Sequence, residues 1–171
     1  MKTKGGYFSR LALLAVYMMV SLAVITGCGS KPAEKAVAEE KIDVEGIKLQ
    51  LEARVNKIAA DYKEYVDVYK VYLSSELYKM YNNACEKDYI FTDACVFLDA
   101  QDYDKITAEI NAIEVKSNTE ASVSMCFIDS YYGKFDPITL EFIYENGEWR
   151  VDDIVRADGT LRATITNFMN S

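Results

Sequence analysis

The chain has 171 residues, of which 19 are basic and 27 are acidic, and it contains no histidine. The first 27 residues hold three basic and no acidic residues, so residues 28–171 carry 16 basic against 27 acidic side chains, a net charge of −11. This acidity argues against nucleic-acid binding, which needs a basic patch that releases counterions. The lack of histidine excludes histidine-based catalysis, and no Gly-rich phosphate loop is present. We therefore expect no cofactor and no metal.

The N-terminus has the layout of an export signal. Basic residues precede an apolar run from Leu11 to Ile25, whose 15 residues fall short of the roughly 20 that span a bilayer. The run therefore disfavours the alternative of an uncleaved anchor helix. Ile25-Thr26-Gly27-Cys28 resembles the lipobox of bacterial lipoproteins. The resemblance implies cleavage after Gly27 and lipidation of Cys28.

The resemblance also implies a place in the cell and a domain organisation. The expected location is the bacterial cell envelope, on the exported side and most simply the outer membrane, with the lipid as the membrane partner. Several acyl chains are needed for stable attachment. Residues 28–42 are too polar to fold alone and form a flexible tether that reaches on the order of 20 Å. Residues 43–171 would form a single folded domain.

Two helices are expected at the start of this domain. Apolar residues recur at threes and fours from Val44 to Tyr72, which is the period of one helix face. Ser74 or Ser75 is a good N-cap for a second helix that ends near Cys85, with Glu76 in its first turn.

Strands follow. Ile110–Val115 is predicted as a strand, although a helical period also fits this stretch. After a turn at Asn118-Thr119, alternation over residues 121–127 predicts that Cys126 points away from the face of Val123, Met125 and Phe127.

The C-terminal third completes the pattern. A loop is expected at 133–137, and Asn146-Gly147 signals a two-residue hairpin. Trp149 and Val151 open the last expected strand. The inward-facing residues of the strand before the hairpin are predicted to be Ile138, Leu140, Phe142 and Tyr144. A short final helix would bury Leu161, Ile165, Phe168 and Met169, capped by Asp158 or Thr160.

This order predicts an α+β domain in which N-terminal helices pack on an antiparallel sheet of about four strands, followed by a short C-terminal helix. Residues 149–154, Trp-Arg-Val-Asp-Asp-Ile, resemble the closing strands of the nuclear transport factor 2-like superfamily. With Tyr72–Leu77 and Phe97–Tyr103, they resemble an uncharacterised family of exported and lipid-anchored bacterial proteins, domain-of-unknown-function family 3828. The resemblance implies a curved, cystatin-like cone fold with a cavity, and no assigned activity.

Tyrosines on the first helix and two residues of the last strand are the candidate pocket lining, since tyrosine offers an aromatic face and one polar tip. The alternatives are plain core and a partner-facing groove. Strict alternation places Asp153 inward as a possible general base, although a bulge would turn it to solvent. The candidate residues are Tyr62, Tyr65, Tyr69, Trp149 and Asp153.

The other candidate groups are cysteines and acidic residues. Cys85 and Cys95 give the shortest of three possible disulfides, and three buried thiols are an equal alternative. The acidic segment 99–104 lacks the spacing of a calcium loop and is better explained as a solvated loop.

Three functions remain. The first is a non-enzymatic, lipid-anchored module that binds another envelope protein. The second is a module that binds a small apolar or aromatic molecule in the cavity. The third is an acid–base enzyme that uses Asp153 with a tyrosine.

Overall fold

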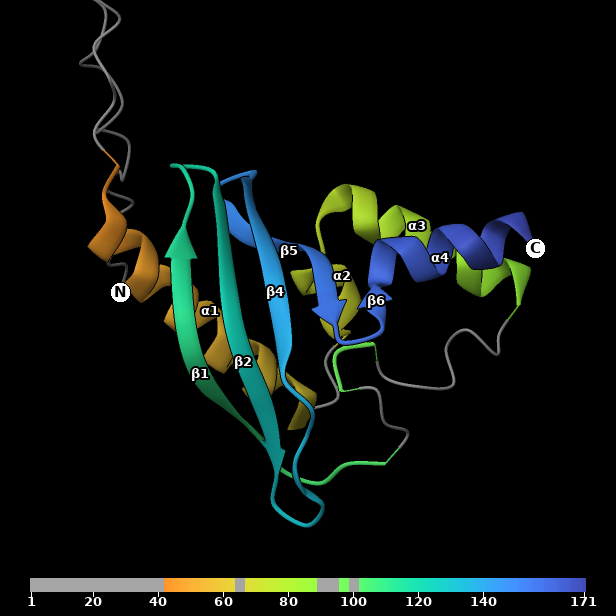
Figure 1. The fold of residues 1–171 in the computed structure, drawn as a ribbon, viewed down its shortest axis with the longest axis horizontal. Helices are drawn as coiled ribbons and strands as arrows, with labels where there is room; N and C mark the ends of the chain where they lie inside the picture. Colours follow the sequence, from red (N-terminus) through yellow and green to blue (C-terminus); the bar gives the residue numbers. More distant parts are fainter. Residues whose placement is uncertain (1–41, 64–66, 89–95, 99–101) are drawn as a thin grey trace, which may run out of the picture. The chain divides into compact units, whose positions relative to one another are not determined.

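The structure, a computed structural model, describes residues 42–63, 67–88, 96–98 and 102–171. The expected signal peptide and nearly all of the tether lie outside these residues. The described part has helices first, then a curved antiparallel sheet, then a short C-terminal helix, and so belongs to the α+β class (Figure 1). The elements are α1 (Val44–Lys63), α2 (Val68–Tyr72), α3 (Ser75–Lys87), β1 (Ile106–Val115), β2 (Glu120–Asp129), β3 (Gly133–Lys134), β4 (Ile138–Glu145), β5 (Glu148–Arg156), β6 (Gly159–Thr160) and α4 (Leu161–Asn170).

The long helical period of the sequence is divided in the structure. α1 ends at Lys63, and α2 begins behind its own N-cap, Asp67, whose carboxylate accepts the backbone N–H of Lys70 at 3.2 Å. The expectation of one helix face reaching Tyr72 is therefore wrong. A helix N-cap side chain bonds the otherwise unpaired N–H groups of the first turn, so an aspartate there starts a new helix.

The second expected helix is confirmed. α3 has Ser74 as its N-cap, with the hydroxyl accepting the backbone N–H of Leu77 at 3.1 Å, and Glu76 lies in the first turn. α3 continues two residues beyond Cys85, to Lys87.

The sheet has six strands, in the order β1-β2-β4-β5-β6 with β3 paired to β2. The expectation of about four strands is wrong in number, because two strands of two residues each escape any periodic signal. Each follows a tight turn with a glycine at positive φ, Gly133 at 87° and Gly159 at 145°. Glycine adopts this backbone conformation without the steric cost that a Cβ would bring.

One face of the sheet packs on α1 and forms the core. Val123, Met125 and Phe127 of β2 are at most 1% exposed, as the alternation predicts. Cys126 is buried but is not part of this core cluster, which agrees with its expected position on the other face.

Two residues predicted to be buried are exposed. Tyr144 is 42% exposed at the end of β4, and Met169 is 39% exposed in the last turn of α4. Each is the second-last residue of its element, where the hydrophobic period of the sequence continues but the side chain is no longer buried.

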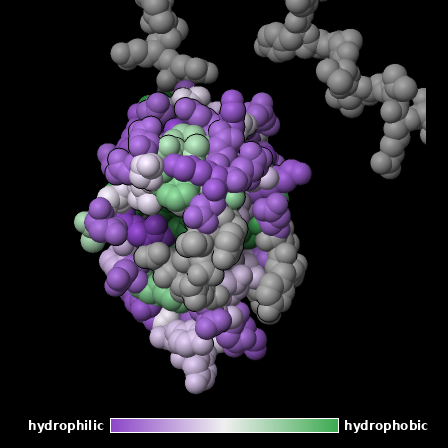
Figure 2. Space-filling model, turned by 90° about the vertical axis from the view of Figure 1, so that its right-hand side faces the viewer, coloured by the Kyte–Doolittle hydropathy of each residue, from purple (hydrophilic) through white to green (hydrophobic). Residues whose placement is uncertain are grey.

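The hairpin and the terminal helix match their signals. Asn146 and Gly147 both have positive φ, 53° and 85°, as a type I′ turn requires. Thr160 is the N-cap of α4, with its hydroxyl 3.2 Å from the backbone nitrogen of Ala163. The face that carries α3 and α4 is mostly hydrophilic with small separate apolar patches (Figure 2).

Candidate functional site

The structure does not bring the candidate pocket residues together. Tyr62 is 3% exposed and its ring packs edge-on against Phe97 and Phe127, with centroids 5.9 and 6.3 Å apart. Tyr69 stacks on the same Phe97 ring at 6.2 Å. Tyr65 lies outside the described residues. The interpretation of these tyrosines as core is therefore the better one, because their rings fill the space between helices and sheet.

Trp149 belongs to a different part of the domain. Its indole N–H donates to the Gln50 side-chain oxygen at 3.1 Å, near the start of α1, and its ring contacts Tyr144 with centroids 5.3 Å apart. Because Tyr62 lies near the other end of α1, Trp149 and Tyr62 do not line one site.

Asp153 serves the final helix. The β4–β5 pairing shifts by one residue at Asp152, because Glu141 pairs with Asp153 while Phe142 pairs with Val151. This bulge turns Asp153 away from the core. Its carboxylate accepts the backbone N–H of Arg162 at 3.1 Å, in the first turn of α4. The general-base hypothesis is thus replaced by a capping role.

The neighbouring Asp152 forms a polar tie that the sequence did not reveal. It accepts the Ser74 hydroxyl at 2.7 Å and the Arg162 guanidinium at 2.6 Å. Arg162 also donates to the backbone oxygen of Asp152 at 2.7 Å. This tie joins α3, β5 and α4. No local motif marks it, since Ser74 and Asp152 are 78 residues apart.

Asp61 and Tyr72 form a buried carboxylate–tyrosine pair. The fully buried Tyr72 hydroxyl donates to the Asp61 carboxylate, and the Lys57 ammonium lies 3.1 Å from it. The hydrogen bond from Tyr72, aided by Lys57, lowers the Asp61 pKa against the opposing effect of burial. Burial and then the Asp61 carboxylate raise the Tyr72 pKa.

These shifts make the Asp61–Tyr72 pair unsuited to acid–base work near neutral pH. A base needs a raised carboxyl pKa and an acid needs a lowered phenol pKa, and both groups shift in the opposite direction. The Arg54 guanidinium also covers the Tyr72 ring at 4.5 Å. The pair is a structural link between α1 and α2.

The cysteine and acidic candidates are described only in part. Cys85 is half-buried, and Cys28 and Cys95 lie outside the described residues, so the pairing of Cys85 with Cys95 stays a prediction. Asp102 and Asp104 are exposed, whereas residues 99–101 are not described. Within the described ranges, no group of three or more acidic or cysteine side chains is placed to hold a metal ion.

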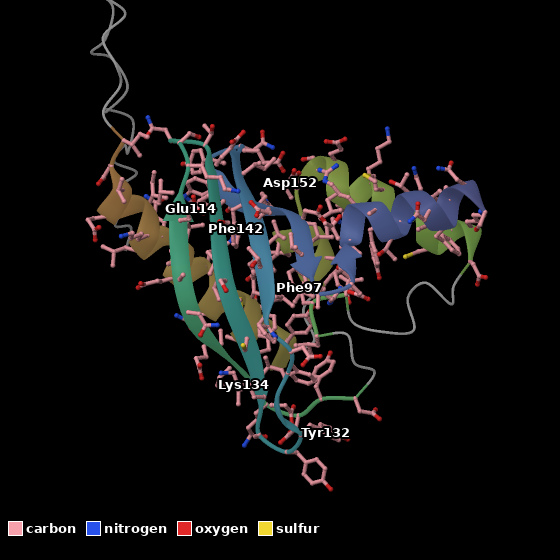
Figure 3. The ribbon with its side chains drawn as sticks, viewed as in Figure 1. Phe97, Glu114, Tyr132, Lys134, Phe142 and Asp152 are labelled. Atoms are coloured by element: carbon pink, nitrogen blue, oxygen red, sulfur yellow. The ribbon has the colours of Figure 1, made fainter. Side chains whose placement is uncertain are left out.

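Among the described residues, the most exposed aromatic side chains lie at the turn between β2 and β3. Residues 130–132, here called the tyrosine tip, carry Tyr131 and Tyr132, whose side chains are 80% and 57% exposed. Their rings meet edge to face, with centroids 4.9 Å apart and planes at 82°. Tyr132 projects beyond the end of the sheet (Figure 3). The sequence pattern predicted a loop only at 133–137 and assigned nothing to residues 130–132, although the adjacent aromatics between Asp129 and Gly133 were the available signal.

The tyrosine tip is held by Asp129, a carboxylate only 2% exposed. One of its oxygens accepts the backbone N–H groups of Tyr131 and Tyr132, at 2.7 and 2.8 Å. The other accepts the N–H of Asp104 at 2.6 Å. Burial raises the Asp129 pKa, and these three donors outweigh it, so that the pKa is lowered overall. An aspartate at the first position of a tight turn stabilises the turn in this way.

A second set of contacts fastens the tyrosine tip to the segment before β1. The Ser130 backbone N–H donates to the Lys105 oxygen at 3.0 Å, and its hydroxyl donates to the Asp104 carboxylate at 2.7 Å. The exposed rings therefore stand on a fixed backbone, and ordering them for a partner costs little conformational entropy.

The described part of the chain contains no helix with the length and apolar character needed to cross a membrane.

Comparison with known proteins assigns no family. Neither a scan against protein-family models nor a search of curated proteins finds a match. Among solved structures, a phospholipid-binding protein from Ralstonia solanacearum in complex with a phospholipid aligns with 16% identity and a TM-score of 0.36. The alignment covers 67% of this chain and 58% of that chain, less than two thirds of its length. We infer neither fold nor ligand from a likeness at this level.

Proposed function

We propose that this protein is a lipid-anchored, non-enzymatic component of the bacterial cell envelope, most simply of the outer membrane, that binds another envelope protein through the tyrosine tip. The observation that carries the proposal is the exposed pair Tyr131–Tyr132 on a turn held by the buried carboxylate of Asp129. Rigid, exposed tyrosines are typical anchors of protein interfaces.

The tyrosine tip lies far from the first turns of α1, at the other end of the folded domain. Tyr62, in the last turns of α1, contacts Phe127 near the tip, whereas Gln50 near the other end of α1 contacts Trp149. The 20 residues of α1 span about 30 Å. The tyrosine tip and the start of α1 therefore lie at opposite ends of the folded domain.

The chemistry of the tyrosine tip favours a protein over other partners. The two rings stand nearly perpendicular, so they offer no shared flat platform for a base or a sugar ring. Each ring can instead enter a shallow pocket while its hydroxyl stays at the wet rim of the interface. The net acidity of the chain also disfavours anionic polymers and anionic headgroups.

The two alternative functions find less support. A small-molecule cavity lined by Tyr62 and Tyr69 conflicts with the packing of their rings against Phe97. An enzyme built on Asp153 conflicts with its capping of α4.

The proposal is tested by cross-linking in living cells. A photo-reactive phenylalanine derivative replaces Tyr132, and the matched control carries it at Tyr144, a partly exposed tyrosine at the other end of the sheet. We expect one specific envelope protein to be captured from position 132 and not from position 144. Adding Asp129→Ala should lower the yield severalfold, because the turn loses two hydrogen bonds and the link from Asp129 to Asp104 is lost as well. No specific product, or equal products from both positions, would refute the proposal.

The anchor is tested separately. Cys28→Ser should move the protein from the membrane fraction to the soluble exported fraction, because acylation needs the thiol. A variant that stays in the membrane fraction would contradict the lipid anchor and leave the tyrosine-tip hypothesis standing.

A further inference from the structure

β1 is an edge strand whose outer edge is open. The sheet order places β1 at one end, and β2 is the only strand that pairs with it in the described residues (Figure 1). Its outer side makes no backbone hydrogen bond to any residue that the structure describes. Ten residues of extended backbone are therefore available for pairing.

The register shows which backbone groups of β1 face outward. The Ser130 N–H bonds the Lys105 oxygen, so Lys105 faces β2, and in an antiparallel pair the facing alternates along the strand. Beyond the register shift at Asn111, the Lys116 N–H bonds the Glu120 oxygen, so Lys116 also faces β2 and the alternation is counted back from it. The N–H and C=O groups that point away from β2 belong to Ile106, Ala108, Ile110, Ile113 and Val115.

The side chains of these residues form an apolar row beside the open edge that the core covers only in part. Apart from Tyr144 at the end of β4, the core-facing residues of β2, β4 and β5 are at most 5% exposed. In β1 only Ile106 is buried to that degree, and the core-facing residues that follow it are only partly buried against the core. These residues are Ala108, Ile110, Ile113 and Val115. An added strand would cover this row as β2 covers its other side.

The face of β1 that points away from the core carries acidic residues, which favour basic residues in an added strand. Glu109 and Glu114 are exposed there, and Glu109 already pairs with Lys134 at 2.7 Å (Figure 3). A second copy of β1 would bring glutamates near one another, which destabilises cross-strand pairing, whereas lysine or arginine opposite them stabilises it. The bulge at Asn111 also interrupts long self-pairing, a common protection of natural edge strands.

We infer that the open edge of β1 binds an extended segment of a partner protein, in which apolar residues alternate with lysine or arginine. Backbone hydrogen bonds supply affinity in this mode and alternate side chains supply specificity. Ser130 joins the tyrosine tip to Lys105 just before β1, so the two surfaces are continuous. The inference rests on the proposed function for the existence of a protein partner.

The test uses the full-length protein in detergent micelles and a ten-residue peptide of alternating valine and lysine. Amide hydrogen exchange of β1 is measured with and without peptide, and a peptide of alternating valine and glutamate is the control. We expect exchange at Ala108 and Ile110 to slow by about tenfold or more with the lysine peptide only. Equal protection by both peptides, or none, would overturn the inference.

Two variants sharpen the test. Ala108→Pro removes an outward N–H and leaves the bonds to β2 in place, so it should abolish the protection. The double variant Glu109→Lys, Glu114→Lys avoids any backbone change and should reverse the peptide preference. Glu52→Lys, the same type of substitution at one exposed position of α1, should leave the peptide preference unchanged.

The remaining outcomes separate this inference from the proposed function. Protection of β1 without peptide, in a protein that light scattering shows to be dimeric, would identify a second copy as the occupant and overturn the inference. If β1 is protected from exchange without peptide and this protection disappears on deletion of residues 29–41, the occupant is the chain's own tether. This outcome would also overturn the inference. Capture of a partner through Tyr132 with no peptide response at β1 would refute the inference alone.

Discussion

The tyrosines of this protein fall into two groups that use the same side chain in opposite ways. Tyr62 and Tyr72 are at most 3% exposed and lie among rings and charged groups of the helices. Tyr131 and Tyr132 are more than half exposed on the tyrosine tip. A buried aspartate is part of each arrangement, but Asp61 accepts a tyrosine hydroxyl, whereas Asp129 accepts the backbone N–H groups of the tyrosines.

The comparison shows that a buried carboxylate can fix either a side chain or a segment of backbone. Asp61 holds a side chain in place and so contributes to stability. Asp129 holds a backbone in place and leaves the side chains above it free to meet a partner. We therefore expect substitutions in the first group to affect folding, and substitutions in the second group to affect binding.

The largest effect is expected from Tyr62→Ala. Its ring packs against Phe97, Tyr103 and Phe127, and removing a buried aromatic ring from a core costs about 3–5 kcal/mol. The free energy of unfolding from a urea titration is the measurement. A loss below about 1 kcal/mol would mean that the site collapses around the missing ring or is filled by solvent.

Tyr72→Phe should have the next largest effect. The ring stays beneath the Arg54 guanidinium, but Asp61 loses its hydrogen bond from the hydroxyl, which costs about 1.5–3 kcal/mol when the acceptor is charged. Tyr131→Phe is the matched control, because the same atom is removed at a side chain that is 80% exposed. Equal losses in the two variants would remove the distinction between the two groups.

Acid should weaken the domain partly through Asp61. Its folded-state pKa lies below the unfolded value near 4, so its contribution to stability is complete above pH 4 and is lost as the pH falls through the folded-state pKa. Asp61→Asn should therefore flatten the decline of unfolding free energy below pH 4. Glu52→Gln, at an exposed position of the same helix, should keep the decline of the wild type.

The smallest effect on stability is expected from Tyr132→Ala. Surface substitutions away from packed features change stability by about 0.5 kcal/mol or less. The same variant should lose most of its partner capture, measured by a photo-reactive group at Tyr131. Large destabilisation with intact capture would reverse the assignment of this tyrosine to binding.

Elements with their own local signals were predictable from the sequence. The alternation in β2, the Ser74 cap of α3 and the Asn146-Gly147 turn all appear in the structure at the expected residues. Each depends on neighbours within a few positions, which a sequence displays directly.

Features that depend on distant neighbours were not predictable. The tie of Ser74, Asp152 and Arg162 joins three elements, and the bulge that turns Asp153 outward is a property of the β4–β5 pairing. The packing of Tyr62 and Tyr69 against Phe97 was not predictable for the same reason, since the helical period places residues on one face but does not identify the rings that they contact. The exposure of Tyr131 and Tyr132 likewise depends on where the turn projects.

The short parallel bridge between Leu73 and Val151 has a consequence for the order of folding. The Ser74 N–H bonds the Val151 oxygen at 2.8 Å, and the indole of Trp149 reaches Gln50 from 99 residues away. Contacts at such sequence separation are slow to form, because a long loop must close before they stabilise anything. The helices are synthesised before β5, and their packing is complete only when β5 has formed. A chain truncated before Glu148 would lack the strand that contacts Gln50, Leu73 and Ser74.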